Sequence, residues 1–227
     1  MRVELLAENR EWLVCVKPAG LLSERGGLPE LLEAQCGGEV WCVHRLDRAV
    51  GGVMVYARSR RAAARLSEAI AARRMEKTYF AVVEGKPEPA AGELRDLLYH
   101  DAARNKSFVV QRPRAGVKEA RLEYERLETL ETAELQDKTL SLVKIRLHTG
   151  RSHQIRVQFA SRQTPLAGDR RYGGRLALPG PALWACELCF PDPGSGEERR
   201  FFAPPPAVEP WTRFPFFNAD KRKGEEN

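Results

Sequence analysis

Short apolar runs, separated by turns that contain Gly and Pro, recur along the chain. Runs rich in Val, Leu and aromatic residues between such turns are typical of buried strands. We expect strands at 12–16, 40–43, 51–57, 78–84, 120–124, 140–147, 183–190 and 199–202. The last two should form a hairpin around 192–196. Residues 86–117 are rich in Pro, Gly and charge and predict loops with an edge hairpin at 106–111.

Three segments instead have the spacing of an amphipathic helix. They cover residues 29–35, 59–74 and 153–162. Ser59 and Ser152 are the expected N-caps of the second and third helices, since a serine hydroxyl accepts a bond from a free helical N–H. Mostly antiparallel strands with a few helices predict an α+β fold.

The length of 227 residues and a hydrophobic content of 43% allow a full core, in one large domain or two small ones. Residues 219–227 are polar and predict a disordered tail. The N-terminal residues contain no apolar stretch long enough for a signal peptide or a membrane span. We therefore expect a cytoplasmic protein.

The net charge of +6 and the isoelectric point of about 9.2 come mainly from arginine. Guanidinium groups match phosphate oxygens and stack on bases, which favours an RNA or DNA partner. Arginine richness from codon usage in a GC-rich genome is the alternative.

Five cysteines, an odd number, lie mostly among Val, Trp and Leu, as buried free thiols do. Cys186 and Cys189 have the spacing of half a zinc site, but no second pair of this kind follows. Residues three apart on a strand also face opposite sides. The sequence therefore predicts neither disulfides nor a metal site.

His44-Arg-Leu-Asp-Arg48 interrupts two apolar runs, 40–43 and 51–57. A carboxylate between two buried strands is expected at the mouth of a cleft, where cations hold it. Asp47 is therefore the first candidate for chemistry, and Arg45 and Arg48 leave positive charge for a phosphate. A surface turn with a salt bridge is the competing interpretation.

A second polar cluster lies at 147–157, where a strand is followed by Gly150 and then by a helix. Such a turn presents backbone N–H groups to an anion, so a phosphate site is expected there. Arg151 and Arg156 cannot point the same way. Arg156 lies on an apolar face, and we expect it to be buried and paired with Asp47. A core ion pair without a catalytic role is the alternative.

Two hydrolase classes are disfavoured by the residues around His and Ser. A two-histidine phosphoesterase needs two facing pairs of a His with a Thr or Ser. His148 with Thr149 could supply one pair, and no other histidine supplies the second. No serine stands in a Gly-x-Ser-x-Gly elbow, which disfavours a Ser-His-Asp hydrolase.

Four ordered motifs make the chain resemble the RluA-type pseudouridine synthases. They are Val16-Lys-Pro-Ala-Gly-Leu21, His44-Arg-Leu-Asp-Arg48 with Gly52, Lys77-Thr-Tyr-Phe-Ala-Val-Val-Glu-Gly85, and Thr149-Gly-Arg-Ser-His-Gln-Ile-Arg156. Gly168-Asp169, Tyr172-Gly173 and Leu183-x-Ala185 extend the match, which covers roughly residues 12–205.

The resemblance implies a single catalytic domain over 1–218, without an N-terminal S4 domain, built on a mixed, mostly antiparallel sheet with flanking helices and a central catalytic cleft. It implies isomerisation of uridine to pseudouridine in rRNA or tRNA, with the uridine flipped out of the RNA. No cofactor or metal is needed, and we expect a monomer. The implied catalytic residues are Asp47, Tyr79 and Arg156, and the implied RNA-binding residues are Arg45, Arg48, Arg151, His153 and Leu183.

Two departures from the family pattern stand out. Val50-Gly51 occupies the place of the usual Thr-Ser after the catalytic Asp, and Trp184 that of a His. The loss of two hydroxyls leaves a second hypothesis open, a catalytically inactive RNA-binding or RNA-chaperone protein of the same fold. For Tyr79 the alternative is a core aromatic on a strand.

Overall fold

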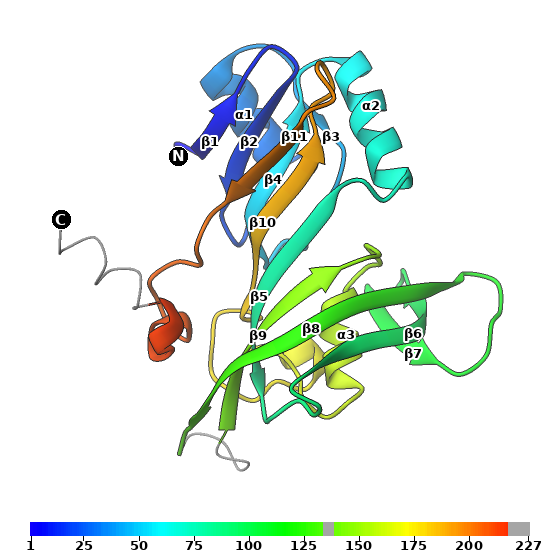
Figure 1. The fold of residues 1–227 in the computed structure, drawn as a ribbon, viewed down its shortest axis with the longest axis vertical. Coiled ribbons are helices and arrows are strands. Elements are labelled where there is room, and N and C mark those ends of the chain that lie inside the picture. The colour runs from blue at the N-terminus through cyan, green and yellow to red at the C-terminus, as the bar shows by residue number, and fades with distance from the viewer. Residues whose placement is uncertain (134–138, 218–227) are drawn as a thin grey trace. The chain divides into compact units, whose positions relative to one another are not determined.

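The computed structural model describes residues 1–133 and 139–217, which form two compact units (Figure 1). The first unit comprises Met1–Thr78 and Trp184–Ala203, and the second comprises Tyr79–Leu183 and the described residues from Pro204 onward. Strands and helices are mixed, with mostly antiparallel pairing, so the predicted α+β class is confirmed.

The strands are β1 (Glu4–Glu8), β2 (Trp12–Lys17), β3 (Trp41–Cys42), β4 (Gly51–Ala57), β5 (Glu76–Glu84), β6 (Ala91–Asp101), β7 (Lys106–Val110), β8 (Val117–Glu131), β9 (Thr139–Leu147), β10 (Leu183–Pro191) and β11 (Glu198–Phe202). The helices are α1 (Leu28–Cys36), α2 (Arg60–Ala71) and α3 (Gln154–Ala160), with short 3-10 turns at Arg170–Tyr172, Trp211–Arg213 and Pro215–Phe217.

In the first unit, β4 is the central strand and is buried along its whole length. β2 pairs with it antiparallel on one side, and β1 pairs with β2. On the other side β3 pairs with the end of β4, while β10 pairs parallel with its first two residues. β11 folds back on β10, which confirms the predicted hairpin.

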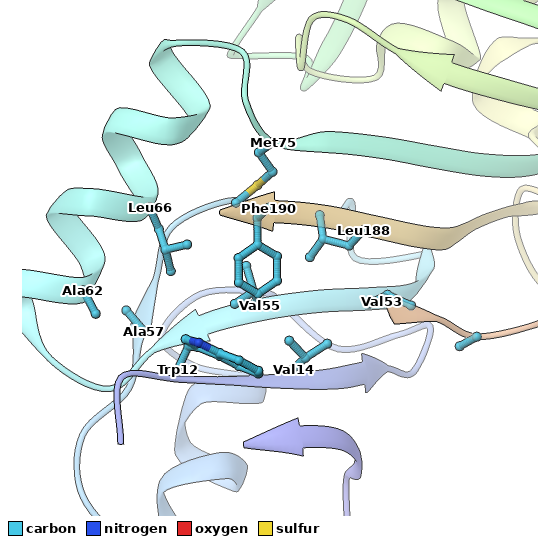
Figure 2. Close-up of a cluster of buried hydrophobic side chains, with 11 residues drawn as sticks. Trp12, Val14, Val53, Val55, Ala57, Ala62, Leu66, Met75, Leu188 and Phe190 are labelled. Atoms are coloured by element: carbon cyan, nitrogen blue, oxygen red, sulfur yellow. The ribbon is translucent and has the colours of Figure 1, made fainter. Parts of the chain in front are cut away.

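The core of this unit lies between the sheet and α2 (Figure 2). The Ser59 hydroxyl caps α2 by accepting a bond from the Ala62 N–H at 3.1 Å, as predicted. Ala62 and Leu66 then face the sheet, where Phe190 packs edge-on against Trp12. Complete burial of a leucine side chain stabilises a fold by about 2 kcal/mol, so this apolar stripe holds the helix in place.

In the second unit, β9, β8, β6 and β7 form an antiparallel series, with β5 beside β9. The helix α3 covers one face of it, where Val157 packs with Leu98 and Ala120. Tyr124 and Phe159 meet edge-on on the same side. The sheet thus supports the helix that carries the last of the four motifs.

Several sequence-based predictions of elements were wrong at their edges. β6 lies in a region expected to be loops. Only Leu94 and Leu98 are buried in this strand, and Arg95 and Asp96 between them are polar, so the sequence shows no clear strand pattern. β8 runs on to Glu131, beyond the predicted end at 124, since its pairing with β9 continues there. The strand β1 was not predicted at all.

The helix α2 ends at Ala71 and not at Arg74. Arg73 adopts a left-handed conformation with φ of 56°, and the Arg74 N–H bonds the Ala69 carbonyl at 2.8 Å. This is the reversal that commonly ends a helix.

The predicted single domain over 1–218 stays a prediction, and the predicted tail at 219–227 lies outside the described residues. Within the described residues, no helix is both long and apolar enough to cross a membrane.

Candidate active site

Asp47 lies in the loop between β3 and β4, as the sequence predicts, and is half-buried. Its carbonyl accepts a bond from the Val50 N–H at 3.0 Å, which closes a turn just before β4. The next carbonyl, that of Arg48, accepts bonds from the Gly20 N–H at 2.7 Å and from Lys17 Nζ at 3.2 Å. The carboxylate is therefore presented from a main chain that is fixed on its C-terminal side.

Lys17 is completely buried at the end of β2, and the sequence analysis did not single it out. Its ammonium donates to the carbonyls of Pro18 and Arg48. Burial lowers the pKa of Lys17 to about 8, while the nearby charge of Asp47 acts in the opposite direction. A cation thus lies close to Asp47. A lysine followed by proline at the end of a buried strand is the signal in the sequence that could have identified this residue.

His44, three residues before Asp47, is a buried acceptor on the other side of the loop. Its Nε2 accepts a bond from the Val55 N–H at 3.2 Å, so the ring proton is on Nδ1. Burial, and then the charge of Lys77, hold the pKa of His44 well below its usual range. A neutral ring therefore ties the start of this loop to β4.

Arg45 and Arg48 are both exposed, as residues that meet a phosphate must be. Arg45 Nη1 lies 2.9 Å from the carboxylate of Glu24, also exposed, and Arg48 Nε donates to the Gly20 carbonyl. Exposed ion pairs contribute little stability, so a phosphate can replace Glu24 beside Arg45 at low cost. Their role in RNA binding stays a prediction.

Arg156 is buried in α3, as predicted, but the structure supplies a carboxylate that the sequence analysis did not name as its partner. Asp169, which is itself buried, accepts bonds from Arg156 Nε at 2.7 Å and from Nη2 at 2.8 Å. This two-pronged geometry is the strongest that an arginine and a carboxylate form. The predicted pairing of Arg156 with Asp47 joins the two units and stays a prediction.

Tyr172 supports the same guanidinium, which lies 5.1 Å from the centre of its ring. The Tyr172 hydroxyl accepts a bond from the Ser107 N–H at 2.7 Å and lies 2.9 Å from His153 Nδ1. Burial raises the pKa of this tyrosine. A phenol that stays neutral therefore orients both Arg156 and His153.

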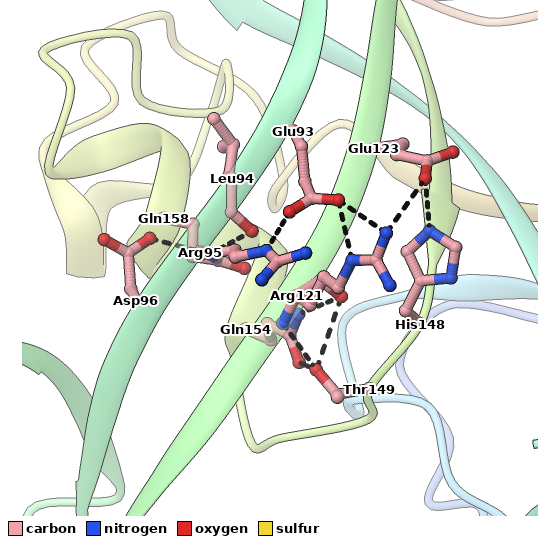
Figure 3. A network of polar contacts seen from close by, with 10 residues as sticks. All are labelled: Glu93, Leu94, Arg95, Asp96, Arg121, Glu123, His148, Thr149, Gln154 and Gln158. Carbon is pink, nitrogen blue, oxygen red and sulfur yellow. Dashed lines mark hydrogen bonds and ion pairs between the residues drawn. The ribbon is translucent and has the colours of Figure 1, made fainter.

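The loop before α3 is closed by the side chain of Gln154 (Figure 3). The Gln154 carbonyl oxygen accepts bonds from the Arg151 N–H at 3.1 Å and from the Thr149 hydroxyl at 2.7 Å. The same amide donates to the Arg121 carbonyl on β8. The Arg151 N–H is therefore already satisfied within the loop, and the predicted phosphate site at this turn stays a prediction.

The predicted N-cap of α3, Ser152, is wrong, because His153 occupies the N-cap position in a left-handed conformation with φ of 53°. Arg151 remains exposed, with its Nε on the Glu119 carbonyl. Next to this loop, Arg121 pairs with Glu93 at 2.6 Å, and Glu123 contacts both Arg121 and His148 (Figure 3).

The family model described as RNA pseudouridylate synthase matches residues 11–161. This chain belongs to that family. The resemblance to the RluA-type pseudouridine synthases, inferred from the four motifs, is thereby confirmed. The matched range contains Asp47, Tyr79 and Arg156.

Curated relatives of the pseudouridine synthase family agree. An uncharacterized RNA pseudouridine synthase of Chloroflexus aurantiacus is 36% identical over 84% of this chain and 62% of its own length. Ribosomal large subunit pseudouridine synthase D of Xanthomonas campestris is 34% identical over 90% of this chain and 66% of its own length. An uncharacterized RNA pseudouridine synthase of Mycobacterium bovis is 34% identical, and the chain spans 52% of its length.

Solved structures show the same fold. Human RNA Pseudouridylate Synthase Domain Containing 1 superimposes with a TM-score of 0.76 at 21% identity, over 91% of this chain and 85% of the other. Human RNA Pseudouridylate Synthase Domain Containing 4 gives 0.73 at 23% identity, over 89% and 88%. The pseudouridine synthase fold is therefore established for this chain.

Two of the site residues that the family resemblance implies, Tyr79 and Leu183, are buried on strands. Tyr79 lies on β5 and Leu183 at the start of β10, with 5% and 7% of their surfaces exposed. Such burial fits a core role, and it also fits side chains that a flipped base would contact. The catalytic role of Tyr79 and the RNA contact of Leu183 stay predictions.

The cysteines are free thiols, and Cys186 and Cys189 are buried on β10. Within the described parts of the chain, no three His, Cys, Asp or Glu side chains gather as metal ligands.

Proposed function

We propose that this protein isomerises specific uridines to pseudouridine in ribosomal or transfer RNA. Family membership and fold support this activity. Because the chain spans about half to two thirds of the length of the curated relatives named above, the RNA and the uridine are part of the proposal.

The observation that carries the proposal is the setting of Asp47. Its carboxylate projects from a loop whose main chain is fixed at Arg48, and the ammonium of buried Lys17 lies nearby. A carboxylate that serves as nucleophile or base must be held in one orientation, and the fixed main chain at Arg48 supports this.

The reaction breaks the bond between C1′ of the ribose and N1 of uracil and joins C1′ to C5. C5 releases its proton and N1 takes one up, so the product is an isomer of the substrate. Asp47 is assigned the role of nucleophile or base in this sequence. Tyr79 is assigned stacking on the flipped uracil, which is worth about 1–3 kcal/mol per base. Arg156, oriented by Asp169 and Tyr172, is assigned the orientation of the reacting groups.

Release of tritium from RNA labelled at uracil C5 tests the proposal, because isomerisation leaves the mass of the RNA unchanged. We expect release with purified protein and none with Asp47→Asn, while that variant still binds RNA. Asp101→Asn serves as the matched control on β6, and it should release tritium like the parent protein.

Two outcomes would contradict the assignment. Multiple turnovers by Asp47→Asn, with contaminating enzyme excluded, would remove Asp47 from the chemistry. RNA binding by the parent protein without any tritium release on rRNA and tRNA would favour the second hypothesis, an inactive RNA-binding protein, which the Val50-Gly51 departure keeps open.

A further inference from the structure

We infer that the buried hydroxyl of Ser23 is the positioning group that sets the place of Asp47, an inference that rests on the proposed function. Ser23 Oγ donates to the Leu46 carbonyl at 2.9 Å and accepts a bond from the Leu46 N–H at 3.0 Å. Both polar groups of the residue directly before Asp47 are thus bound by one side chain. Ser23 has 3% of its surface exposed, so water does not compete for these bonds.

Ser23 is itself held in place from two sides. The Tyr56 hydroxyl, on the central strand β4, donates to the Ser23 carbonyl at 2.7 Å. On the preceding residue, the Leu22 carbonyl accepts a bond from the Leu28 N–H at 2.9 Å. Gly27 lies so close that an added Cβ would be 2.5 Å from the same carbonyl. Hydrogen bonds through Tyr56 and Ser23 therefore connect the central strand β4 to the loop that carries Asp47.

The two hydrogen bonds of Ser23 fix the loop on the N-terminal side of Asp47, whereas the contacts at Arg48 fix its C-terminal side. Gly20 and Lys17 hold the carbonyl that follows Asp47, whereas Ser23 holds the peptide groups that precede it. Removal of the hydroxyl leaves the buried N–H and carbonyl of Leu46 without this partner, so the loop must shift to satisfy them. A catalytic group displaced by about 1 Å can lose roughly 100-fold in rate.

Steady-state kinetics of Ser23→Ala on C5-tritiated RNA test the inference. We expect kcat to fall about 10- to 100-fold with KM nearly unchanged, because Ser23 touches Leu46 and not the RNA. Ser59→Ala is the matched control, since it also removes a hydroxyl that accepts a backbone N–H in the same unit. It should keep the kcat of the parent protein.

Amide hydrogen exchange provides a readout that does not depend on activity. The Leu46 N–H should exchange faster in Ser23→Ala than in the parent protein, and at an unchanged rate in Ser59→Ala. Tyr56→Phe, which keeps the Ser23 hydroxyl and removes its anchor, should show both effects to a smaller extent and decides the case if Ser23→Ala does not fold.

Equal kcat values for Ser23→Ala and Ser59→Ala, or an unchanged Leu46 exchange rate in Ser23→Ala, would overturn the inference. Equal kcat and Leu46 exchange values for Tyr56→Phe and the parent protein would do so where Ser23→Ala is unfolded. A parent protein that releases no tritium would instead overturn the proposed function, and the two failures are thereby distinguishable.

Discussion

Trp184 fills the space that a side chain at position 51 would need. The two residues are partners in the parallel pairing of β4 and β10, and an added Cβ on Gly51 would lie 2.4 Å from Cζ3 of the indole. These are two of the three positions at which the chain departs from the RluA-type pattern, where Ser and His are usual. The absence of a side chain at position 51 therefore leaves the space that the indole of Trp184 occupies.

Gly51→Ser should accordingly destabilise the protein by about 1–3 kcal/mol through overpacking. In the Trp184→His background the same substitution should cost less, because the smaller ring leaves room for the serine. Urea unfolding of the two single variants and the double variant gives the coupling free energy, which should be about 0.5–3 kcal/mol. Additive effects of the two substitutions would show that the residues do not compensate.

The pair of Arg156 and Asp169 gives a second prediction. Asp169→Asn leaves a buried guanidinium without its carboxylate, so the free energy of unfolding should fall by about 3–5 kcal/mol. Replacing both partners, by Arg156→Met with Asp169→Leu, should restore part of that loss. The measurement is chemical denaturation and not activity, because Arg156 has a proposed catalytic role. A double variant less stable than Asp169→Asn would contradict the prediction.

Two variants of Tyr79 separate base stacking from proton transfer. Tyr79→Phe keeps the aromatic face, so we expect nearly normal RNA affinity with slow turnover, whereas Tyr79→Leu should lose both. Filter binding and tritium release measure the two properties on the same RNA. If both variants retain the parent rates, Tyr79 is a packing residue of β5.

Salt dependence of RNA affinity tests whether the arginines of α2 and of the turn that follows it contact phosphate. Arg61 is paired with Glu11 at 2.7 Å, and Arg65 donates to the Pro193 carbonyl. We therefore expect the exposed residues Arg60, Arg73 and Arg74 to supply the contacts. Their joint replacement by Ala should flatten the slope of log K against log salt by about 0.7–0.9 per lost phosphate contact.

Replacement of Arg61 and Arg65 by Ala is the matched comparison, and it should change the slope less. An unchanged slope in the triple variant would remove Arg60, Arg73 and Arg74 from the RNA-binding surface.

The lowered pKa of Lys17 predicts a pH dependence of stability. Between pH 8, where folded Lys17 loses its proton, and about pH 10.4, where an unfolded lysine does, the unfolded state binds more protons. Stability from this group therefore rises with pH across that window, by at most about 1.4 kcal/mol per pH unit. As pH rises across that window, the unfolding free energy of the parent protein should increase relative to that of Lys17→Met, with this slope.

Lys118→Met, which alters an exposed lysine on β8, gives the baseline for that comparison. A difference between the parent protein and Lys17→Met that stays constant from pH 8 to pH 10 would contradict the assignment.

The sequence by itself determined the features that depend on neighbours along the chain. The limits of β4 at 51–57, the Ser59 cap and the burial of Arg156 follow from hydrophobic period and local hydrogen bonding. The four motifs, in order, were enough to identify the family.

Only the tertiary structure decided which groups meet. Asp169, Tyr172 and Ser23 come from loops or turns whose paths no local period specifies, so their contacts with Arg156 and Leu46 had no signal in the pattern. Gln154 likewise accepts a bond from the Arg151 N–H within the turn that was expected to bind a phosphate. The physical reason is that a buried polar group must be satisfied by whichever partner the fold brings within hydrogen-bonding distance, and this proximity is set by packing across the chain.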